Sequence, residues 1–88
     1  MAEQVPSVGR IVHYVLPSDG KCRYPGEHRP AIIVRVWGPT QVNLQVLVDG
    51  TNDYPDYNGS VWATSVVYDE TGTTLRSWHW PEYVPAKA

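Results

Sequence analysis

The sequence of 88 residues contains no phenylalanine, and its aromatic side chains are four tryptophans and six tyrosines. Both types combine a large apolar surface with a polar atom, which suits positions that are only half buried. Such side chains can fill a small core or form a surface on which a ligand stacks. The segment SWHWPE near the end of the chain raises this question directly, because it holds Trp78 and Trp80.

Cysteine and long apolar runs are also scarce. Cys22 is the single cysteine, so an intrachain disulfide is excluded. No segment approaches the roughly 20 consecutive apolar residues that span a membrane as a helix. The opening MAEQVPSVGR has neither the basic region nor the apolar run of a secretory signal. We therefore expect a soluble cytoplasmic protein without a membrane partner.

Charged residues make up only 18% of the chain, with a formal net charge of −2 and an isoelectric point of about 5.8. A domain that grips long DNA or RNA normally carries a basic field, with an isoelectric point above about 9. The composition thus argues against long nucleic acid as a partner. A small anionic ligand, held by two or three local cations, remains compatible with it.

The length predicts one domain over residues 1–88, with loose tails at 1–7 and 83–88. Proline and glycine divide the chain into short runs of β character, and no helical apolar stripe appears. The expected strands are Val8–Leu16, Pro30–Trp37, Gln41–Val48, Ser60–Tyr68 and Thr73–Trp80. They predict an all-β fold, a small, strongly bent five-stranded antiparallel sheet or barrel of the Src-homology type. An OB-like barrel is the alternative, although it would usually carry a helix.

Two connections, 17–29 and 49–59, are long for so small a domain, and such loops often serve function. The first holds the densest group of cations in the chain. These are Lys21, Arg23, His28 and Arg29. Arg23 and Arg29, with Tyr24 nearby, could bind phosphate oxygens through their planar guanidinium groups. The simpler interpretation is a solvated loop of mixed charge.

In a strand, Trp78 and Trp80 share one face and His79 points to the other. One interpretation is that the two indoles close the end of the barrel. The other is that they form an aromatic wall for a purine, since stacking on an aromatic side chain contributes ~1–3 kcal/mol per base. Both hold if only one indole is buried.

The three histidines are the candidates for catalysis or metal binding. His13, next to Tyr14 in the first strand, is either a satisfied half-buried side chain or a ligand contact. A metal could in principle be bound by His13, His28 and His79 together with Glu82 or with Asp69-Glu70. However, the sequence contains no HxH, HExxH or CxxC motif, so no metal site and no cofactor is expected. No nucleophile–base pair can be identified. The expectation is a protein that is not an enzyme.

Four segments in order, VGRIVHYVLPSDG, RPAIIVRV, ATSVVYDE and SWHWPE, resemble a group of small uncharacterised proteins encoded by bacteriophages and prophages. That group carries VHYV, (C)RAAIV, SVPYDE and GTWHWPE segments, and the likeness spans roughly residues 8–82. Departures occur at Pro30, Val67 and Arg76-Ser77. The matching motif positions include His13, Tyr14, Arg29, Trp78, His79 and Trp80. The resemblance implies a phage origin, and hence the host cytoplasm, rather than a mechanism.

Small phage proteins without a catalytic centre tend to be virion parts, inhibitors of host proteins, or sponges for defence signals. The leading hypothesis is a homo-oligomeric barrel that sequesters a nucleotide signal such as a cyclic dinucleotide or an ADP-ribose derivative. Its ligand-binding residues would be Trp78, Trp80, His79, Arg29, Arg23, Tyr24, His13 and Tyr14. The alternatives are a capsid decoration protein and an inhibitor that docks on a host protein.

Overall fold

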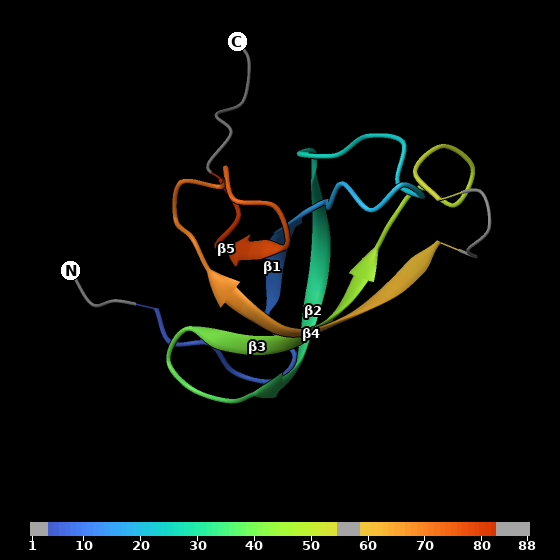
Figure 1. Cartoon of the computed structure of the whole chain (residues 1–88). Coiled ribbons are helices and arrows are strands. Elements are labelled where there is room, and N and C mark those ends of the chain that lie inside the picture. Colours follow the sequence, from blue (N-terminus) through green and yellow to red (C-terminus); the bar gives the residue numbers. More distant parts are fainter. Residues whose placement is uncertain (1–3, 55–58, 83–88) are drawn as a thin grey trace, which may run out of the picture.

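The computed structural model describes residues 4–54 and 59–82, and these form an all-β fold (Figure 1). Its five strands are β1 Ile11–Val15, β2 His28–Val36, β3 Gln41–Leu47, β4 Ser60–Tyr68 and β5 Ser77–His79. The predicted small five-stranded, strongly bent barrel is confirmed. None of the described residues forms a helix that is long and apolar enough to cross a membrane.

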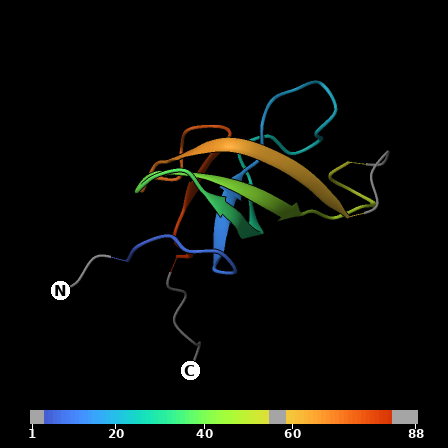
Figure 2. The same cartoon turned by 90° about the horizontal axis from the view of Figure 1, so that it is seen from below.

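The five strands close into a barrel in the order β1-β2-β3-β4-β5, with β5 returning to pair with β1. All neighbouring pairs are antiparallel except β4 and β5, which run parallel, so the expectation of a purely antiparallel sheet is corrected at this seam. Seen from below, β3 and β4 are long curved ribbons (Figure 2). The short β5 completes the barrel between β4 and β1.

The core follows from the alternation of apolar and polar side chains along the strands. In β3, Val42, Leu44 and Val46 are fully buried, whereas Gln41 and Gln45 are only partly covered. Buried side chains of the other strands and of the loops pack with these three residues in a single hydrophobic core. Its remaining buried members are Val12, Tyr14, Leu16, Cys22, Ala31, Ile33, Val48, Tyr54, Ala63, Val66 and Trp78.

Strands β5 and β2 begin at residues other than the predicted ones. The fifth strand was expected from Thr73 but begins at Ser77, because Asp69 organises the preceding segment into a turn. Its carboxylate accepts hydrogen bonds from the Thr74 amide and from the amide and hydroxyl of Thr71. Short polar side chains that bond nearby amides in this way favour turns over strands.

The second strand begins at His28, before the proline at which it was expected to begin. Pro30 lies inside the strand, opposite His13 of β1, and the pairing of β2 with β3 begins only at Ala31. A missing N–H is tolerated where only one side of a strand is paired. This extension places His28 on the sheet rather than in the loop.

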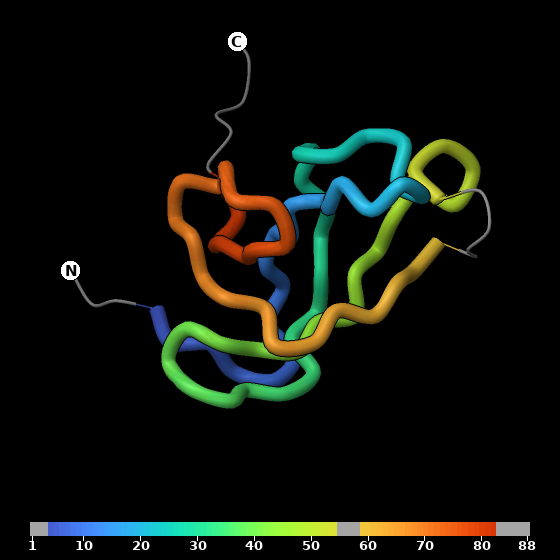
Figure 3. Tube along the Cα trace, in the orientation of Figure 1, coloured from blue at the N-terminus to red at the C-terminus, as the bar shows by residue number. Residues whose placement is uncertain are grey.

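The two long loops lie side by side at one end of the barrel (Figure 3). The Arg23 amide donates to the Asp53 carbonyl at 3.0 Å, which ties the loop after β1 to the loop after β3. Part of the second loop, 55–58, and the predicted tail residues 1–3 and 83–88 lie outside the described residues. Residues 4–7 form no strand.

Candidate functional site

The fold brings all three histidines of the chain to one place with Glu82. His13 lies in the middle of β1, His28 begins β2 and His79 ends β5. His13 is the direct cross-strand partner of His79, and His28 lies opposite Val15, two residues further along β1. All three therefore share the outer face of the sheet. We call these three residues and Glu82 the histidine cluster.

The carboxylate of Glu82 lies among the three imidazoles. Its Oε1 is 3.0 Å from Nδ1 of His13 and 2.5 Å from Nε2 of His79, and its Oε2 is 3.1 Å from Nδ1 of His28. His79 is buried, whereas the side chain of Glu82 is 49% exposed. The cluster therefore has a buried inner side and a solvent-facing outer side.

The charge of Glu82 follows from these contacts. Burial acts to raise the pKa of its carboxyl group, but hydrogen bonds from His79, His13 and His28 outweigh it and lower the pKa to about 2. Near neutral pH the cluster consequently holds a full negative charge beside three imidazole rings. That combination of one carboxylate and three nitrogen donors is a ligand set for a metal ion.

Gly72 lies against the rings of two members of the histidine cluster. Its carbonyl accepts a hydrogen bond from Nε2 of His28 at 2.9 Å. A Cβ atom on Gly72 would lie 2.9 Å from Cε1 of His28 and 3.1 Å from Cε1 of His79, and its φ is +69°. The loop can pass this close to both rings because the residue is glycine. Nδ1 of His79 is buried without a hydrogen-bond partner among the described residues.

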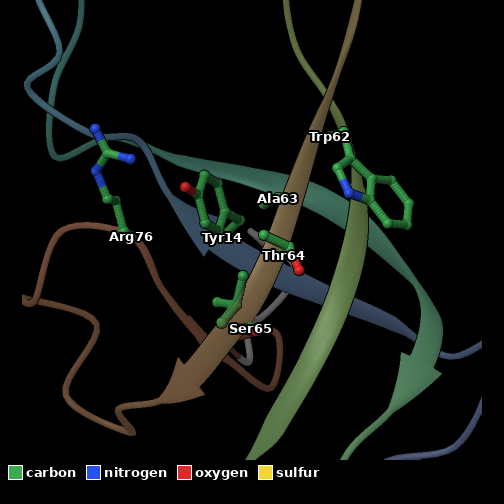
Figure 4. A pocket seen from close by; sticks show the side chains of 7 residues that line it. Tyr14, Trp62, Ala63, Thr64, Ser65 and Arg76 are labelled. Carbon is green, nitrogen blue, oxygen red and sulfur yellow. The ribbon is translucent and has the colours of Figure 1, made fainter.

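A second feature is a hollow of about 280 Å³ beside strand β4 (Figure 4). We call it the β4 hollow. It is lined by Tyr14, Trp62, Ala63, Thr64, Ser65, Val66 and Arg76. In Figure 4, Arg76 and Tyr14 lie on one side of β4 and Trp62 on the other, with Thr64 and Ser65 on the strand between them. Its wall thus joins a guanidinium, two hydroxyls, a phenol and an indole.

The hollow coincides with an irregularity in β4. Opposite Asn43 the register between β3 and β4 shifts, and Ser65 has a φ of +54°. The side-chain oxygen of Asn43 holds this bulge, because it accepts from the Ser65 amide at 2.7 Å and the Thr64 hydroxyl at 3.0 Å. Arg76, on the other side of the hollow, has a φ of +63°.

Ser65 and Arg76 are the only described non-glycine residues with positive φ, and both line the hollow. Backbone conformations of this kind cost free energy, and they concentrate at functional sites. The guanidinium of Arg76 makes no ion pair within the described part of the chain. Burial raises the pKa of the Tyr14 hydroxyl, and the positive charge of Arg76 opposes that rise. The hollow therefore carries the positive charge of Arg76 without a carboxylate among its lining residues.

The chain matches no known protein family, no curated protein and no solved structure. The two candidate sites accordingly stand on their geometry alone.

The predicted ligand-binding residues divide between several places. Trp78 is 1% exposed and packs in the core, where its indole N–H donates to the Thr40 carbonyl at 3.0 Å. Trp80 is half-buried against it, and the guanidinium of Arg10 lies 4.8 Å from the centre of a Trp80 ring. Of the two interpretations of SWHWPE, core packing describes Trp78, and a partly open face remains only at Trp80.

The loop cations do not gather around these indoles. Arg29 is held by the buried carboxylate of Asp53 and by Glu27, while Arg23 and Tyr24 are exposed in the loop. His13 and His79 meet in the histidine cluster, and Tyr14 lines the β4 hollow. The predicted set therefore does not form one site.

The sequence analysis missed Trp62 and Arg76 as partners. It considered the three histidines with Glu82 as a metal-binding set and rejected that set because no motif spacing links them. The four residues of the cluster come from three strands and the segment after β5, so no linear spacing reveals them. Strand alternation alone predicts that His13 and His79 point away from the core. Only the register of β1 with β5, which the sequence does not show, makes them neighbours.

Proposed function

We propose that the protein is a non-catalytic binding module that captures a small anionic ligand with a flat ring, of the nucleotide type, in the β4 hollow. The observation that carries this proposal is that Arg76, without a carboxylate partner in the described chain, and the 54% exposed Trp62 line the same hollow. The pair supplies a positive charge and an aromatic face to one ligand.

Each part of the hollow suits one part of a nucleotide. The guanidinium of Arg76 matches phosphate oxygens in a bidentate fashion. The indole of Trp62 offers a stacking surface worth ~1–3 kcal/mol for a base. The hydroxyl of Ser65 lies between them and can bond a sugar or a phosphate. An indole that stacks on a base beside an arginine that binds phosphate was expected at Trp78 and Arg29, and Trp62 and Arg76 fit this arrangement better.

The lining also favours capture over turnover. The hollow has no carboxylate, imidazole or thiol among its lining residues, so it offers no conventional general base or activated nucleophile. A bound nucleotide would be held and later released unchanged. This property suits a phage protein that sequesters a defence signal in the host cytoplasm, which is the leading hypothesis from the sequence.

The size of the hollow indicates how much ligand one copy can enclose. At about 280 Å³ it lies just below the roughly 300–1,000 Å³ of drug-sized pockets, which matches a single nucleotide unit. A cyclic dinucleotide would need two hollows, and a two-fold homodimer would supply them. An exposed apolar row supports such a dimer. The row runs across four neighbouring strands, and its exposed apolar members are Ile11, Ile32 and Trp62. Ile11 pairs with Ile32, and Gln45 is the cross-strand partner of both Ile32 and Trp62.

The same apolar row favours a second candidate function. Exposed apolar residues on neighbouring strands are typical of surfaces that contact another protein. In a virion decoration protein or an inhibitor of a host protein, this row would be the contact surface and the hollow would stay empty. Mass spectrometry of purified virions and a pull-down from host lysate separate these two roles from a sponge.

The direct test measures binding of a nucleotide panel by calorimetry. The panel holds cyclic dinucleotides, ADP-ribose derivatives and mononucleotides. We expect Arg76→Gln to abolish binding and Arg23→Gln, which removes an equal charge from the exposed loop, to leave it unchanged. If every member of the panel binds with a dissociation constant above ~10 μM, the proposal is wrong. Equal losses in both arginine variants would show that only net charge matters.

A further inference from the structure

The histidine cluster converges on a volume of the right size for one metal ion. In a tetrahedral zinc site the metal–nitrogen and metal–oxygen bonds are about 2.0–2.2 Å, which sets neighbouring ligand atoms roughly 3.3 Å apart. One ligand atom from each of the four residues lies within 4.8 Å of every other. The nitrogen–oxygen distances to Glu82 are 2.5, 3.0 and 3.1 Å, so these contacts would have to lengthen by ~0.2–0.8 Å to reach that spacing. A shift of the carboxylate by less than about 1 Å would make room for the ion.

The hydrogen atoms around His28 give a second, independent argument. Nε2 of His28 bonds the Gly72 carbonyl, which can only accept, so this nitrogen carries a proton. The 3.1 Å contact between Nδ1 and Oε2 of Glu82 is therefore a hydrogen bond only in a ring that carries a proton on both nitrogens. In a ring with its single proton on Nε2, a lone pair of Nδ1 faces the lone pairs of the ionised carboxylate. Two acceptors that face each other repel unless a positive charge lies between them. Either an extra proton or a metal ion can supply that charge.

The bond to Gly72 has the form expected around a metal. A histidine that binds a metal through one nitrogen usually donates its other N–H to a carbonyl or carboxylate, which fixes the ring. His28 has this arrangement already, with Gly72 pressed against its edge. The ring is thus held so that its lone pair points into the cluster.

We propose that His13, His28, His79 and Glu82 bind one divalent transition-metal ion of the zinc type. Imidazole nitrogens suit zinc, copper, iron and nickel, whereas magnesium and calcium prefer a shell of oxygen atoms. The carboxylate supplies charge and a fourth ligand, and its exposed side gives the ion a path from solvent. Four protein ligands close the tetrahedral shell, which is the pattern of a structural rather than a catalytic site.

The position of the site explains what the metal does for the fold. Its ligands join β1, β2 and β5, and β5 is only three residues long, with two paired positions on each side. A domain of this size buries little apolar surface, so its folded state is only marginally stable. A metal ion that links the shortest strand to its neighbours would therefore stabilise the folded state. The histidine cluster and the β4 hollow share no residue, so zinc binding and nucleotide capture are separate proposals.

The experiment titrates Zn²⁺ alone into the full chain, purified with a chelator and then dialysed free of it. Calorimetry gives the stoichiometry and affinity, and thermal unfolding followed by circular dichroism gives the melting temperature with and without Zn²⁺. We expect one Zn²⁺ per chain and a higher melting temperature, since a ligand that binds only the folded state stabilises it. Mg²⁺ and Ca²⁺ at the same concentration should change neither reading.

Two variants decide whether the cluster is the site. His13→Gln and Glu82→Gln should each weaken Zn²⁺ binding by more than the roughly 10–100-fold that loss of a second-shell partner costs. The matched control is Glu70→Gln, an exposed glutamate in the neighbouring turn, which should bind like the original chain. Glu82 is half exposed, so its variant should fold even if His13→Gln does not. No Zn²⁺ binding by the folded original chain, or binding that survives both variants, would overturn the proposal.

Discussion

The guanidinium of Arg29 grips the carboxylate of Asp53 with two hydrogen bonds, from Nε to Oδ2 at 2.6 Å and from Nη2 to Oδ1 at 2.7 Å. The carboxylate is buried, and it also accepts from the Asp49 amide at 2.8 Å. Arg29 belongs to β2 and Asp53 to the loop after β3, so the pair fastens that loop to the barrel. The sequence predicts Arg29 as a ligand-binding residue, but in the structure its guanidinium is held by Asp53.

Replacing Asp53 by Asn should therefore destabilise the protein by about 3 kcal/mol, because it removes the buried carboxylate that pairs with a partly buried guanidinium. The control is Glu27→Gln, which removes the exposed partner of the same arginine and should cost less than about 1 kcal/mol. Urea unfolding followed by tryptophan fluorescence measures both. Equal losses of unfolding free energy in the two variants would show that the buried pair of Arg29 with Asp53 stabilises the fold no more than the exposed pair with Glu27.

The same pair predicts how stability changes with pH. The hydrogen bond from Arg29 outweighs burial and holds the pKa of Asp53 below its ordinary value of 3.8. A carboxyl group whose pKa is lowered by folding stabilises the folded state above its unfolded pKa, and this contribution is lost as the pH falls through the folded value. The free energy of unfolding should therefore fall below about pH 4. Asp53→Asn should reduce that dependence while Glu27→Gln leaves most of it.

Trp78 and Trp62 provide opposite tests of what an indole does in this barrel. Trp78→Ala should cost ~3–5 kcal/mol of stability, because the indole is buried in the core. Trp62→Ala, at a half-exposed position, should change stability by roughly 0.5 kcal/mol or less and weaken nucleotide binding. Denaturant unfolding and the calorimetric panel give the two readings. Ligand binding unchanged in a folded Trp62→Ala variant would contradict the place given to this indole.

The strands were predictable where alternation is strong. Gln41–Leu47 could be read from its sequence because every second residue is apolar and buried. The start of β5 could not be predicted in this way, since the residues before it have β propensity and Asp69 draws them into a turn through local hydrogen bonds. The parallel pairing of β4 with β5 depends on closure of the whole barrel, which no short segment encodes.

The candidate sites were less predictable than the fold for a related reason. His13 and His79 become neighbours only through the register of β1 with β5, and His28 joins them only because β2 extends past Pro30. The β4 hollow depends on the bulge at Ser65, whose sequence environment reads as an ordinary strand. Side chains that meet through register and bulges cannot be paired by spacing along the chain.

Gly72 tests the architecture of the histidine cluster without removing any proposed ligand. In Gly72→Ala the new Cβ would meet the ring of His28 at 2.9 Å, so the ring must move and Zn²⁺ affinity should fall. The control is Gly20→Ala, whose φ is +81° but whose Cβ would meet nothing within 4 Å. Both variants carry the roughly 1–2 kcal/mol penalty of a left-handed alanine. A loss of Zn²⁺ binding confined to Gly72→Ala would show that the close approach of Gly72 to the rings of His28 and His79 shapes the site, and equal affinities in the two variants would contradict it.

Asn43 offers the corresponding test of the β4 hollow. Its side-chain oxygen accepts from the Trp37 indole at 2.9 Å as well as from Thr64 and the Ser65 amide, and the residue is buried. Asn43→Ala would leave these donors without their acceptor, at a cost of about 1–3 kcal/mol. Asn43→Asp keeps an oxygen acceptor at the same place and should retain the bulge. If the bulge shapes the hollow, hydrogen exchange at the Ser65 amide should accelerate in the alanine variant, and nucleotide affinity should fall with it. Faster exchange with unchanged affinity would mean that the ligand does not depend on the conformation of Ser65, and would move the binding site away from this strand.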